Sequence, residues 1–177
     1  MANTIILEIV TPEGVALRQP VSELTAPSVQ GEFGVLPEHR PLLAGLRTGI
    51  VRYRADGEEH SVAIGPGFAK VARGSVSILT DHFMAKEDVD AVVARKDLKE
   101  AEVAILKLSD QAEDSEKAAL IAKVRWAAVR LELYGDPPPA TIMLEHEIRL
   151  LGHEDYAETL RHSEHGEEDE DFSAPAV

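Results

Sequence analysis

The hydrophobic pattern changes its period after Asp81, and this change constrains the fold more than any other feature of the sequence. Up to that point, β-rich segments begin roughly every 8 to 12 residues, apart from the opening loop region, and this spacing is typical of a sandwich or a barrel. These segments are residues 4–10, 21–26, 49–54, 59–64, 68–73 and 75–80. Beyond it, apolar residues recur at alternating steps of three and four, as on one face of a helix. The sequence therefore predicts an N-terminal β-sandwich followed by an α-helical hairpin.

Glycine and proline interrupt the β-rich part at defined places. Asp56-Gly57 and Gly74 are predicted hairpin turns, because these residues tolerate a left-handed backbone. Residues 31–46 carry four glycine or proline residues in their first eleven positions, with a charged tip between two apolar runs. This pattern predicts a shaped loop between strands. Such a loop either only links two strands or presents side chains for binding, and spacing alone leaves both interpretations open.

The helical part contains two matching apolar stripes. The first consists of Ala91, Ala94, Leu98, Ala101, Ile105 and Leu108. The second consists of Leu120, Val124, Ala127 and Leu131, flanked by Ile121 and Ala128. Alanine lets two helices approach closely, so we expect a tightly packed antiparallel pair. Ser115 is the expected cap of the second helix and Gly135 its expected end.

The second helix has a further apolar face. Trp126, Val129 and Leu133 lie roughly opposite the first stripe, so the sandwich, the C-terminal segment or a partner subunit must cover them. The same helix carries four basic residues with no acid among them: Lys117, Lys123, Arg125 and Arg130. Such a run is either a solvated face or complementary to an acidic partner.

Charge is unevenly distributed along the chain. The net charge is −14, and residues 135–177 hold twelve acidic residues against two arginines. A proline run at 137–139 and a short apolar stripe at 144–151 predict short helices, and the composition from Ser163 onward predicts disorder. We therefore expect a sandwich at 1–86, a regulatory helical hairpin at 87–134 and an acidic, partly disordered extension at 135–177.

Several functions are disfavoured by what the sequence lacks. The chain has no cysteine, so it offers no disulfide framework or thiol nucleophile, and reducing cytoplasm is the natural setting. It has no basic face for nucleic-acid phosphates. Its first residues do not resemble a signal peptide, and we expect no membrane-spanning segment.

No catalytic constellation is evident either. The sequence contains no glycine-rich phosphate loop, and two incomplete metalloprotease patterns fail at Leu150 and Ala157. Four histidines gather near the C-terminus: His146, His153, His162 and His165. They form either a weak metal site or, as we favour, solvated side chains. His39 is interpreted as a loop contact because no fixed nucleophile lies near it in sequence.

The order of these parts resembles one known family. Residues 30–43 read Gln-Gly-Glu-Phe-Gly-Val-Leu-Pro-Glu-His-Arg-Pro-Leu-Leu, and they are followed by Gly-Ile-Val-Arg at 49–52 and Ala-Ile-Gly-Pro-Gly-Phe at 63–68. Together with the alanine-rich hairpin, they resemble the epsilon subunit of the F-type ATP synthase, which is called delta in mitochondria. The resemblance covers about residues 3–134.

The resemblance implies a non-catalytic central-stalk subunit of a proton-translocating ATP synthase. In the family, the sandwich binds the gamma subunit and rests on the c-ring, which the positions of Glu32 and His39 face. The hairpin can extend toward the alpha and beta subunits and inhibit ATP hydrolysis; the implied contacts are Lys123, Arg125 and Arg130. The implied location is peripheral, on the cytoplasmic face of the bacterial inner membrane, reached through the complex.

Two departures from the family pattern bear on these expectations. Some members bind a regulatory ATP at the start of the second helix, where this chain keeps Asp114 but has Lys117 in place of arginine. Lysine lacks the planar fork that grips phosphate, so ATP binding through Asp114 and Lys117 is disfavoured and no cofactor is expected. The extension at 135–177 has no counterpart in the usual pattern.

A second class of function stays open on the residues alone. A free β-sandwich could bind a protein or another ligand, with the helices as an oligomerisation arm. Such a module normally presents aromatic side chains, whereas this chain has one tryptophan, three tyrosines and four phenylalanines.

Overall fold

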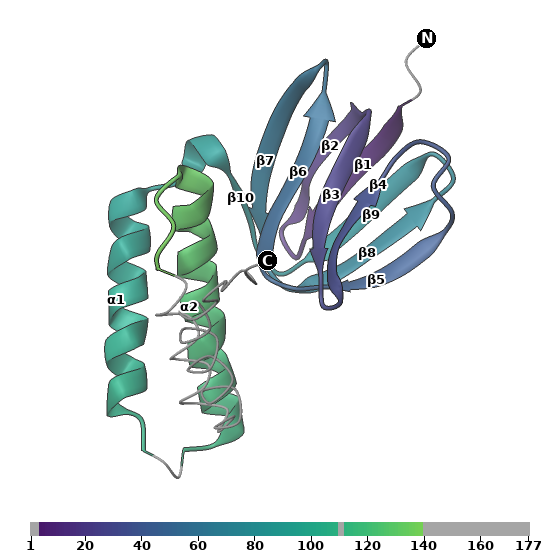
Figure 1. Ribbon diagram of the computed structural model, residues 1–177. Helices are drawn as coiled ribbons and strands as arrows, with labels where there is room; N and C mark the ends of the chain where they lie inside the picture. Colours follow the sequence, from purple (N-terminus) through teal and green to yellow (C-terminus); the bar gives the residue numbers. More distant parts are fainter. Residues whose placement is uncertain (1–3, 110–111, 140–177) are drawn as a thin grey trace, which may run out of the picture.

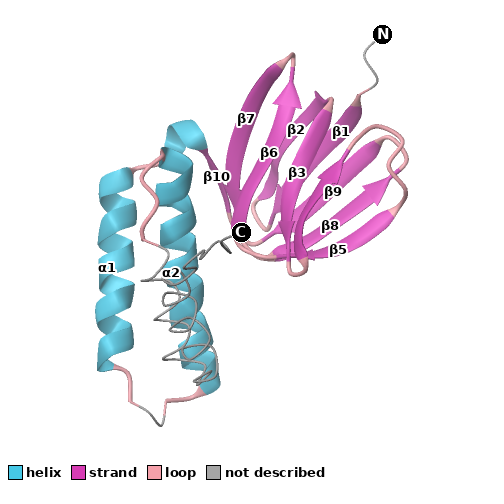
Figure 2. Ribbon diagram, in the orientation of Figure 1, coloured by secondary structure: helices cyan, strands magenta, loops and turns pink. Residues whose placement is uncertain are grey.

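The computed structural model describes residues 4–109 and 112–139 of the 177-residue chain. Figure 1 shows an all-β body beside a pair of long antiparallel helices, and Figure 2 shows that strands and helices are segregated between the two bodies. The predicted order, sandwich first and hairpin second, is confirmed. The expected short helices at 144–151 and the expected disorder after Ser163 lie outside the described residues.

Within the described residues, the β-body consists of ten strands. They are β1 (Ile5–Thr11), β2 (Gly14–Val21), β3 (Glu23–Ser28), β4 (Gly31–Val35), β5 (Leu42–Leu46), β6 (Gly49–Ala55), β7 (Glu58–Ile64), β8 (Gly67–Ala72), β9 (Ser75–Thr80) and β10 (Phe83–Ala85). A short 3-10 helix, η1 (Lys86–Asp88), leads to α1 (Ala91–Lys107) and α2 (Asp114–Tyr134).

The strands form two layers joined at one narrow point. The order is β10-β7-β6-β3-β5-β8-β9-β1-β2, and β4 pairs with β3 outside this path. β3 and β5 share one residue pair, Ser28 with Leu46, so the sheet can fold over on itself there. β1 and β9 are parallel, whereas the other paired strands are antiparallel. Aliphatic side chains from both layers fill the core; the largest fully buried ones include Leu7, Ile9, Val35, Val51, Ile64, Val76 and Ile78.

The interpretation of residues 31–46 as one loop is wrong. Its first five residues form β4, which pairs with β3 from Gly31 opposite Ser28 to Val35 opposite Leu24. Its last five form β5, which pairs with β8. Glycines inside both strands interrupt the alternation of side chains and conceal the pattern. Only residues 36–41 connect the two strands without belonging to either.

The hairpin agrees with the predicted stripes. Its buried cluster holds Ala91, Ala94, Leu98, Ala101, Ile105, Ile121, Val124, Ala127 and Leu131. Asp90 caps α1 by accepting hydrogen bonds from the amides of Val92 and Val93. Gly135 ends α2 with a φ of 103°, and the amides of Gly135 and Asp136 donate to the carbonyl of Leu131, as predicted for a left-handed cap.

The expected cap at Ser115 is wrong. α2 begins at Asp114, and the capping position is Glu113, two residues before Ser115. The Ser115 hydroxyl lies inside the first turn and donates to the Glu113 carboxylate at 3.3 Å. Helix formation at acidic residues is favourable here because carboxylates stabilise a helix N-terminus.

The second apolar face of α2 packs on the sandwich. Val129 and Leu133 are buried against Ile50 of β6 and Ala63 of β7. Met84, Val89 and Trp126 pack around this cluster and are partly buried. The sequence left the sandwich, the C-terminal segment and a partner subunit as possible covers of this face, and in the structure the sandwich covers it. No helix among the described residues is both long enough and apolar enough to cross a membrane.

Candidate interaction surfaces

The outer face of the layer β5-β8-β9-β1 is apolar and exposed. Phe68 pairs with Leu79 across β8 and β9, and their side chains are 60% and 54% exposed. Their neighbours in sequence, Ala69 and Ile78, point inward and are fully buried. Because side chains alternate between the faces of a sheet, burying one set places the other on the outside. Apolar residues on both faces are unusual for a sheet with one solvated side.

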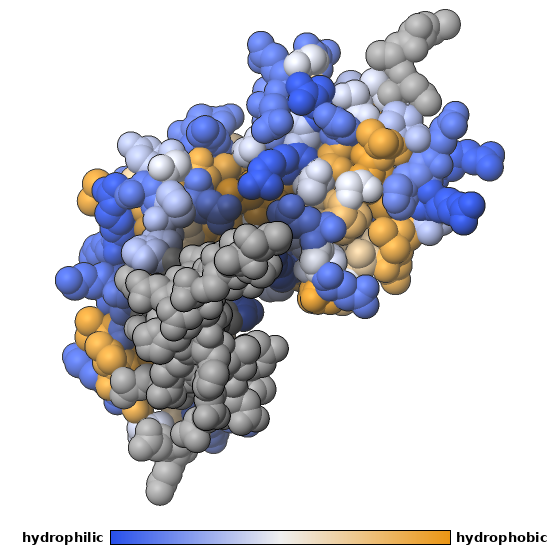
Figure 3. Space-filling view, in the orientation of Figure 1, coloured by the Kyte–Doolittle hydropathy of each residue, from blue (hydrophilic) through white to orange (hydrophobic). Residues whose placement is uncertain are grey.

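This apolar row continues beyond β8 and β9. Leu79 lies opposite Val10 of β1, which in turn lies opposite Val15 of β2. On the other side, Phe68 lies opposite Gly45 of β5, and Val29 covers this glycine. The row therefore crosses five strands. Figure 3 shows orange, apolar patches on the part of the sandwich surface that this view presents.

An open groove of about 650 Å³ runs along the same face. Its lining includes Val10, Val29, Phe68 and Leu79, and Asp81 is its charged residue. Gly45 leaves the groove open beside Val29, since an added Cβ there would occupy this space and lie 3.6 Å from the valine side chain. An exposed apolar surface rimmed by turns is typical of a protein-binding site. We name Val29, Phe68, Leu79, Val10 and Gly45 the outer apolar face.

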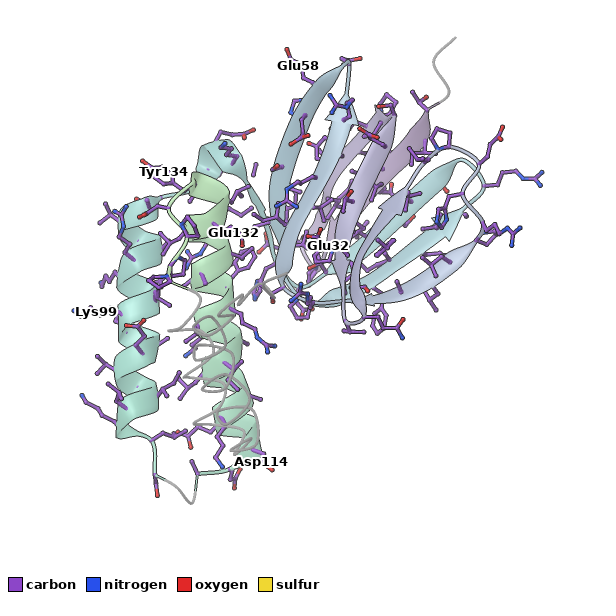
Figure 4. The ribbon with its side chains drawn as sticks, in the orientation of Figure 1. Glu32, Glu58, Lys99, Asp114, Glu132 and Tyr134 are labelled. Atoms are coloured by element: carbon purple, nitrogen blue, oxygen red, sulfur yellow. The ribbon has the colours of Figure 1, made fainter. Side chains whose placement is uncertain are left out.

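Glu32 and His39 lie on two consecutive elements of the sandwich. Glu32 lies near the start of β4, where its carboxylate is 3.5 Å from the Arg52 guanidinium and half exposed. His39 lies beyond the other end of β4, in the connection at 36–41. Figure 4 shows Glu32 well away from Glu58, which marks the opposite end of the sandwich. Glu32 therefore lies within a strand, whereas His39 lies in the connection that follows the same strand.

A tight turn orients His39. The His39 amide donates to the carbonyl of Leu36 at 3.1 Å, Pro37 precedes the turn's third residue, and Glu38 adopts a φ of 68°. Proline followed by a left-handed residue is the pattern of a type II turn. The imidazole Nδ1 donates to the Arg40 carbonyl at 2.7 Å, which fixes the ring against the backbone.

Replacing Glu38 by glycine is expected to stabilise the protein by about 0.5 kcal/mol. The left-handed backbone destabilises a residue with a side chain by about 1 to 2 kcal/mol, and glycine removes this strain. The greater conformational freedom of glycine in the unfolded chain offsets about 0.5 to 1 kcal/mol of the stabilisation. Urea unfolding of the full chain measures the change. Glu38→Val is the control and is expected to destabilise, since a branched side chain tolerates this backbone poorly; equal stability of both variants would contradict the strain.

The three predicted cationic contacts of α2 differ in their surroundings. Lys123 and Arg125 are exposed. The Arg130 side chain is only 11% exposed, and its Nη2 lies 2.6 Å from the Asp97 carboxylate of α1. Its Nε donates to the Trp126 carbonyl, and the guanidinium lies 5.9 Å from the centroid of the indole. Arg130 thus joins α1 to α2, whereas the other two cations face outward.

Replacing Arg130 by alanine is expected to destabilise the hairpin by about 1 to 3 kcal/mol, because it removes a charge-assisted hydrogen bond to Asp97 and a contact with Trp126. Replacing Lys123 by alanine should change stability by less than about 0.5 kcal/mol. Amide hydrogen exchange in α1 and α2 measures both effects. Equal exchange in the two variants would show that the short Arg130–Asp97 contact does not hold the helices together.

Two further contacts were not visible in the sequence. His82, which follows β9, packs against Trp126 with ring centroids 5.0 Å apart and the ring planes tilted by 31°, so it touches the sandwich side of α2. Arg95 of α1 holds Asp136 through bonds of 2.6 and 3.1 Å. Both pairs join segments far apart in the chain. Their residue types are compatible with an aromatic contact and an ion pair, but the pairing can be predicted only when the packing of the helices is known.

Asp114 and Lys117 lie at the end of the hairpin remote from the sandwich, where Figure 4 labels Asp114. The Lys117 ammonium is 3.7 Å from the fully exposed Asp114 carboxylate. Asp114 and Glu116 give the first turn of α2 acidic character, which repels phosphate. No group of His, Asp and Glu suited to a metal ion occurs in the part of the chain that the structure describes. The four C-terminal histidines lie outside that part.

Fold and surface together define a class: a β-sandwich with an exposed apolar face that carries a docked helical hairpin. The family model described as "ATP synthase, Delta/Epsilon chain, beta-sandwich domain" matches residues 4–86. A protein of Anaeromyxobacter dehalogenans called ATP synthase epsilon chain is 41% identical over 129 residues, which are 73% of this chain and 96% of the relative. This chain belongs to the ATP synthase delta/epsilon family.

Further comparisons agree with this assignment. The ATP synthase epsilon chain of Nitratidesulfovibrio vulgaris is 34% identical over 136 residues, 77% of this chain and 99% of the relative. A chain in a structure of the Euglena gracilis mitochondrial ATP synthase, OSCP/F1/c-ring, matches with a TM-score of 0.60 and 25% identity, covering 71% of this chain and 78% of that chain. The bacterial relatives are almost fully covered, whereas about a quarter of this chain lies outside each alignment.

Proposed function

We propose that this chain is a non-catalytic central-stalk subunit of an F-type ATP synthase, and that it couples the c-ring to the gamma subunit. The observation that carries the proposal is the outer apolar face, whose Phe68 and Leu79 are more than half exposed. A stable protein rarely leaves such a row in water, and a large partner subunit would bury it. We assign this face to the gamma subunit.

The c-ring contact is assigned to Glu32 of β4 and to His39 in the connection that follows this strand. The matching Euglena gracilis chain comes from an assembly of OSCP, F1 and the c-ring, which supports a position in the same kind of assembly. The half-exposed Glu32 carboxylate stays available to a polar loop, although Arg52 lies beside it. The protein would then lie on the cytoplasmic face of the inner membrane and associate with it through the complex.

The helical hairpin is proposed to inhibit ATP hydrolysis by reaching the alpha and beta subunits. Its interface with the sandwich is small, since four buried residues, Ile50, Ala63, Val129 and Leu133, form its centre. Lys123 and Arg125 are exposed in this arrangement, whereas the Arg130 side chain is largely buried and lies against Asp97. We therefore assign the first contact with an acidic segment of the head to Lys123 and Arg125, with Arg130 joining only if the Asp97 contact opens.

Co-purification tests the central assignment. A tagged full-length chain, expressed together with the gamma subunit and the other F1 subunits of the same source, is expected to retain gamma through washing. A chain that purifies alone, or as its own oligomer, would favour a free β-sandwich binding module. Reconstituted complexes with Lys123→Ala and Arg125→Ala should hydrolyse ATP faster, and unchanged hydrolysis would remove the inhibitory role of these two side chains.

Regulatory ATP binding at Asp114 and Lys117 is disfavoured in this proposal. The ammonium group of Lys117 is already beside a carboxylate, and the surrounding first turn is acidic. Titration calorimetry of the full-length chain with Mg-ATP is expected to show no binding heat. Saturable binding that disappears in Lys117→Ala would overturn this expectation.

A further inference from the structure

His82 packs against the single tryptophan of the chain where the sandwich meets the hairpin. The centroids of the imidazole and of the Trp126 indole lie 5.0 Å apart, with the ring planes tilted by 31°. His82 belongs to the connection between β9 and β10, whereas Trp126 belongs to α2. The indole is partly buried beside Val129 and Leu133, while His82 is exposed. A ring that can exchange protons with water therefore touches the docked helix.

The sandwich fixes the position of His82. Its carbonyl oxygen accepts the Gly65 amide at 2.9 Å, and the Thr80 hydroxyl lies 3.1 Å from the same oxygen. Gly65 also leaves room for the ring, since an added Cβ would lie 3.3 Å from His82 Cδ2 and 3.1 Å from the His82 nitrogen. The imidazole is thus held by the sandwich backbone, and it meets the indole only while the hairpin is docked.

Protonation changes the strength of this ring contact. Imidazole is the side chain whose charge ordinarily changes between about pH 5 and pH 8. A cation over an indole is attracted to the negative face of the ring, which shifts an equilibrium at exposed sites by about two- to fivefold. The docked hairpin offers His82 this indole, whereas an undocked hairpin does not. Protonation of His82 therefore favours the docked form.

Other charges around the two rings oppose this attraction only weakly. The charged residues within four positions of either ring in sequence are Asp81, Lys86, Lys123, Arg125 and Arg130. The Arg130 guanidinium lies 5.9 Å from the indole centroid, but the Asp97 carboxylate neutralises it at 2.6 Å. Lys123 and Arg125 are exposed, so salt screens their repulsion beyond about 8 Å at 0.15 M. Asp81 and Lys86 accompany His82 whether or not the hairpin is docked.

We propose that His82 is a pH-sensitive latch, which binds the hairpin to the sandwich more tightly when the imidazole is protonated. The ratio of docked to undocked hairpin is expected to rise about two- to fivefold between about pH 8 and about pH 5.5. Acidification would then keep the hairpin away from other subunits. The latch itself lies within one chain, so it stands apart from the proposed inhibition of ATP hydrolysis.

Energy transfer between two dyes on the full-length chain provides the test. The sequence has no cysteine, so Glu13→Cys on the sandwich and Lys99→Cys on α1 give two exposed attachment sites. The Val129→Ala background removes a buried contact of the docked hairpin and so raises the undocked fraction. The docked fraction should increase as the pH falls. About 0.5 M NaCl should preserve this dependence, since salt weakens only the opposing repulsion.

His82→Phe keeps an aromatic ring at the contact but cannot be protonated, so its docked fraction should not depend on pH. The matched control is His60→Phe, because the exposed His60 ring stacks on Tyr53 within the sandwich at 5.3 Å. This control should keep the pH dependence of the parent. Emission of the single tryptophan gives a second measurement, and its quenching on acidification should disappear in His82→Phe alone.

Three results would overturn the latch. The first is a docked fraction that does not change with pH in the parent, and the second is a pH dependence that persists in His82→Phe. The third is a docked fraction that falls on acidification, which would show that repulsion from Lys123 and Arg125 outweighs the attraction of the indole. Each result leaves the binding of the gamma subunit to the outer apolar face untouched, because the measurement uses the chain alone.

Discussion

Replacing Gly67 by alanine is expected to destabilise the sandwich by about 3 kcal/mol or more. Gly67 lies at the start of β8, between Leu46 of β5 and Thr80 of β9. An added Cβ would lie 1.9 Å from the Leu79 carbonyl oxygen and 2.9 Å from the Thr80 Cα. These atoms belong to the backbone of a paired strand, so relief requires β8 and β9 to separate at that point. Overpacking that moves backbone is among the most costly single substitutions.

Urea unfolding of the full chain measures this effect, and Gly34→Ala is the matched control. Gly34 also lies in a strand, but an added Cβ would meet only the Leu24 carbonyl oxygen, at 3.9 Å. Alanine is normally tolerated better than glycine within a strand, so this control should be neutral or slightly stabilising. If Gly67→Ala unfolded at the same urea concentration as the control, the prediction that the β9 backbone leaves no room for a side chain at Gly67 would be wrong.

The helical hairpin could be predicted from sequence because its signal is local. Each stripe recurs within one helix, and the buried positions from Ala91 to Ile105 are those that the period indicates. The Asp56-Gly57 turn was equally accessible, and both residues have a positive φ in the structure. These features depend on neighbouring residues alone and need no knowledge of the tertiary fold.

Strands in which buried and exposed side chains do not alternate regularly were not predicted. β2 has mostly exposed side chains, so its burial pattern carries little apolar signal. β4 contains Gly31 and Gly34, and β5 contains Gly45, so two neighbouring strands looked like one loop. Gly31 has a φ of 118°, which glycine adopts readily, and each of these glycines lacks the side chain from which a strand is recognised.

The candidate surfaces were only partly accessible. The family motif located Glu32 and His39, but their separation along β4 depends on the strand that the sequence did not reveal. The binding of Arg130 by Asp97 depends on the register between α1 and α2, which no periodicity within one helix determines. The outer apolar face depends likewise on the pairing of β8 with β9, because Phe68 and Leu79 become neighbours only there.

Replacing Phe68 by aspartate is expected to weaken binding to the gamma subunit by about 30- to 1,000-fold. Phe68 lies at the centre of the outer apolar face and is 60% exposed, so it is suited to anchor a partner. Aromatic residues at the centre of an interface typically contribute about 2 to 4 kcal/mol when truncated, and an introduced carboxylate adds a desolvation penalty. The stability of the isolated chain should change by less than about 1 kcal/mol, since no core contact is lost.

Affinity is measured by titrating purified gamma subunit against labelled full-length chains, with Val92→Asp as the control. Val92 is 73% exposed and lies in the first turn of α1, where a carboxylate is compatible with the helix N-terminus. The control therefore introduces the same charge at an exposed valine outside the outer apolar face, and its affinity should equal that of the parent. Equal affinity for Phe68→Asp and the parent would mean that gamma binds elsewhere, because an unpaired aspartate buried at the centre of an interface weakens binding.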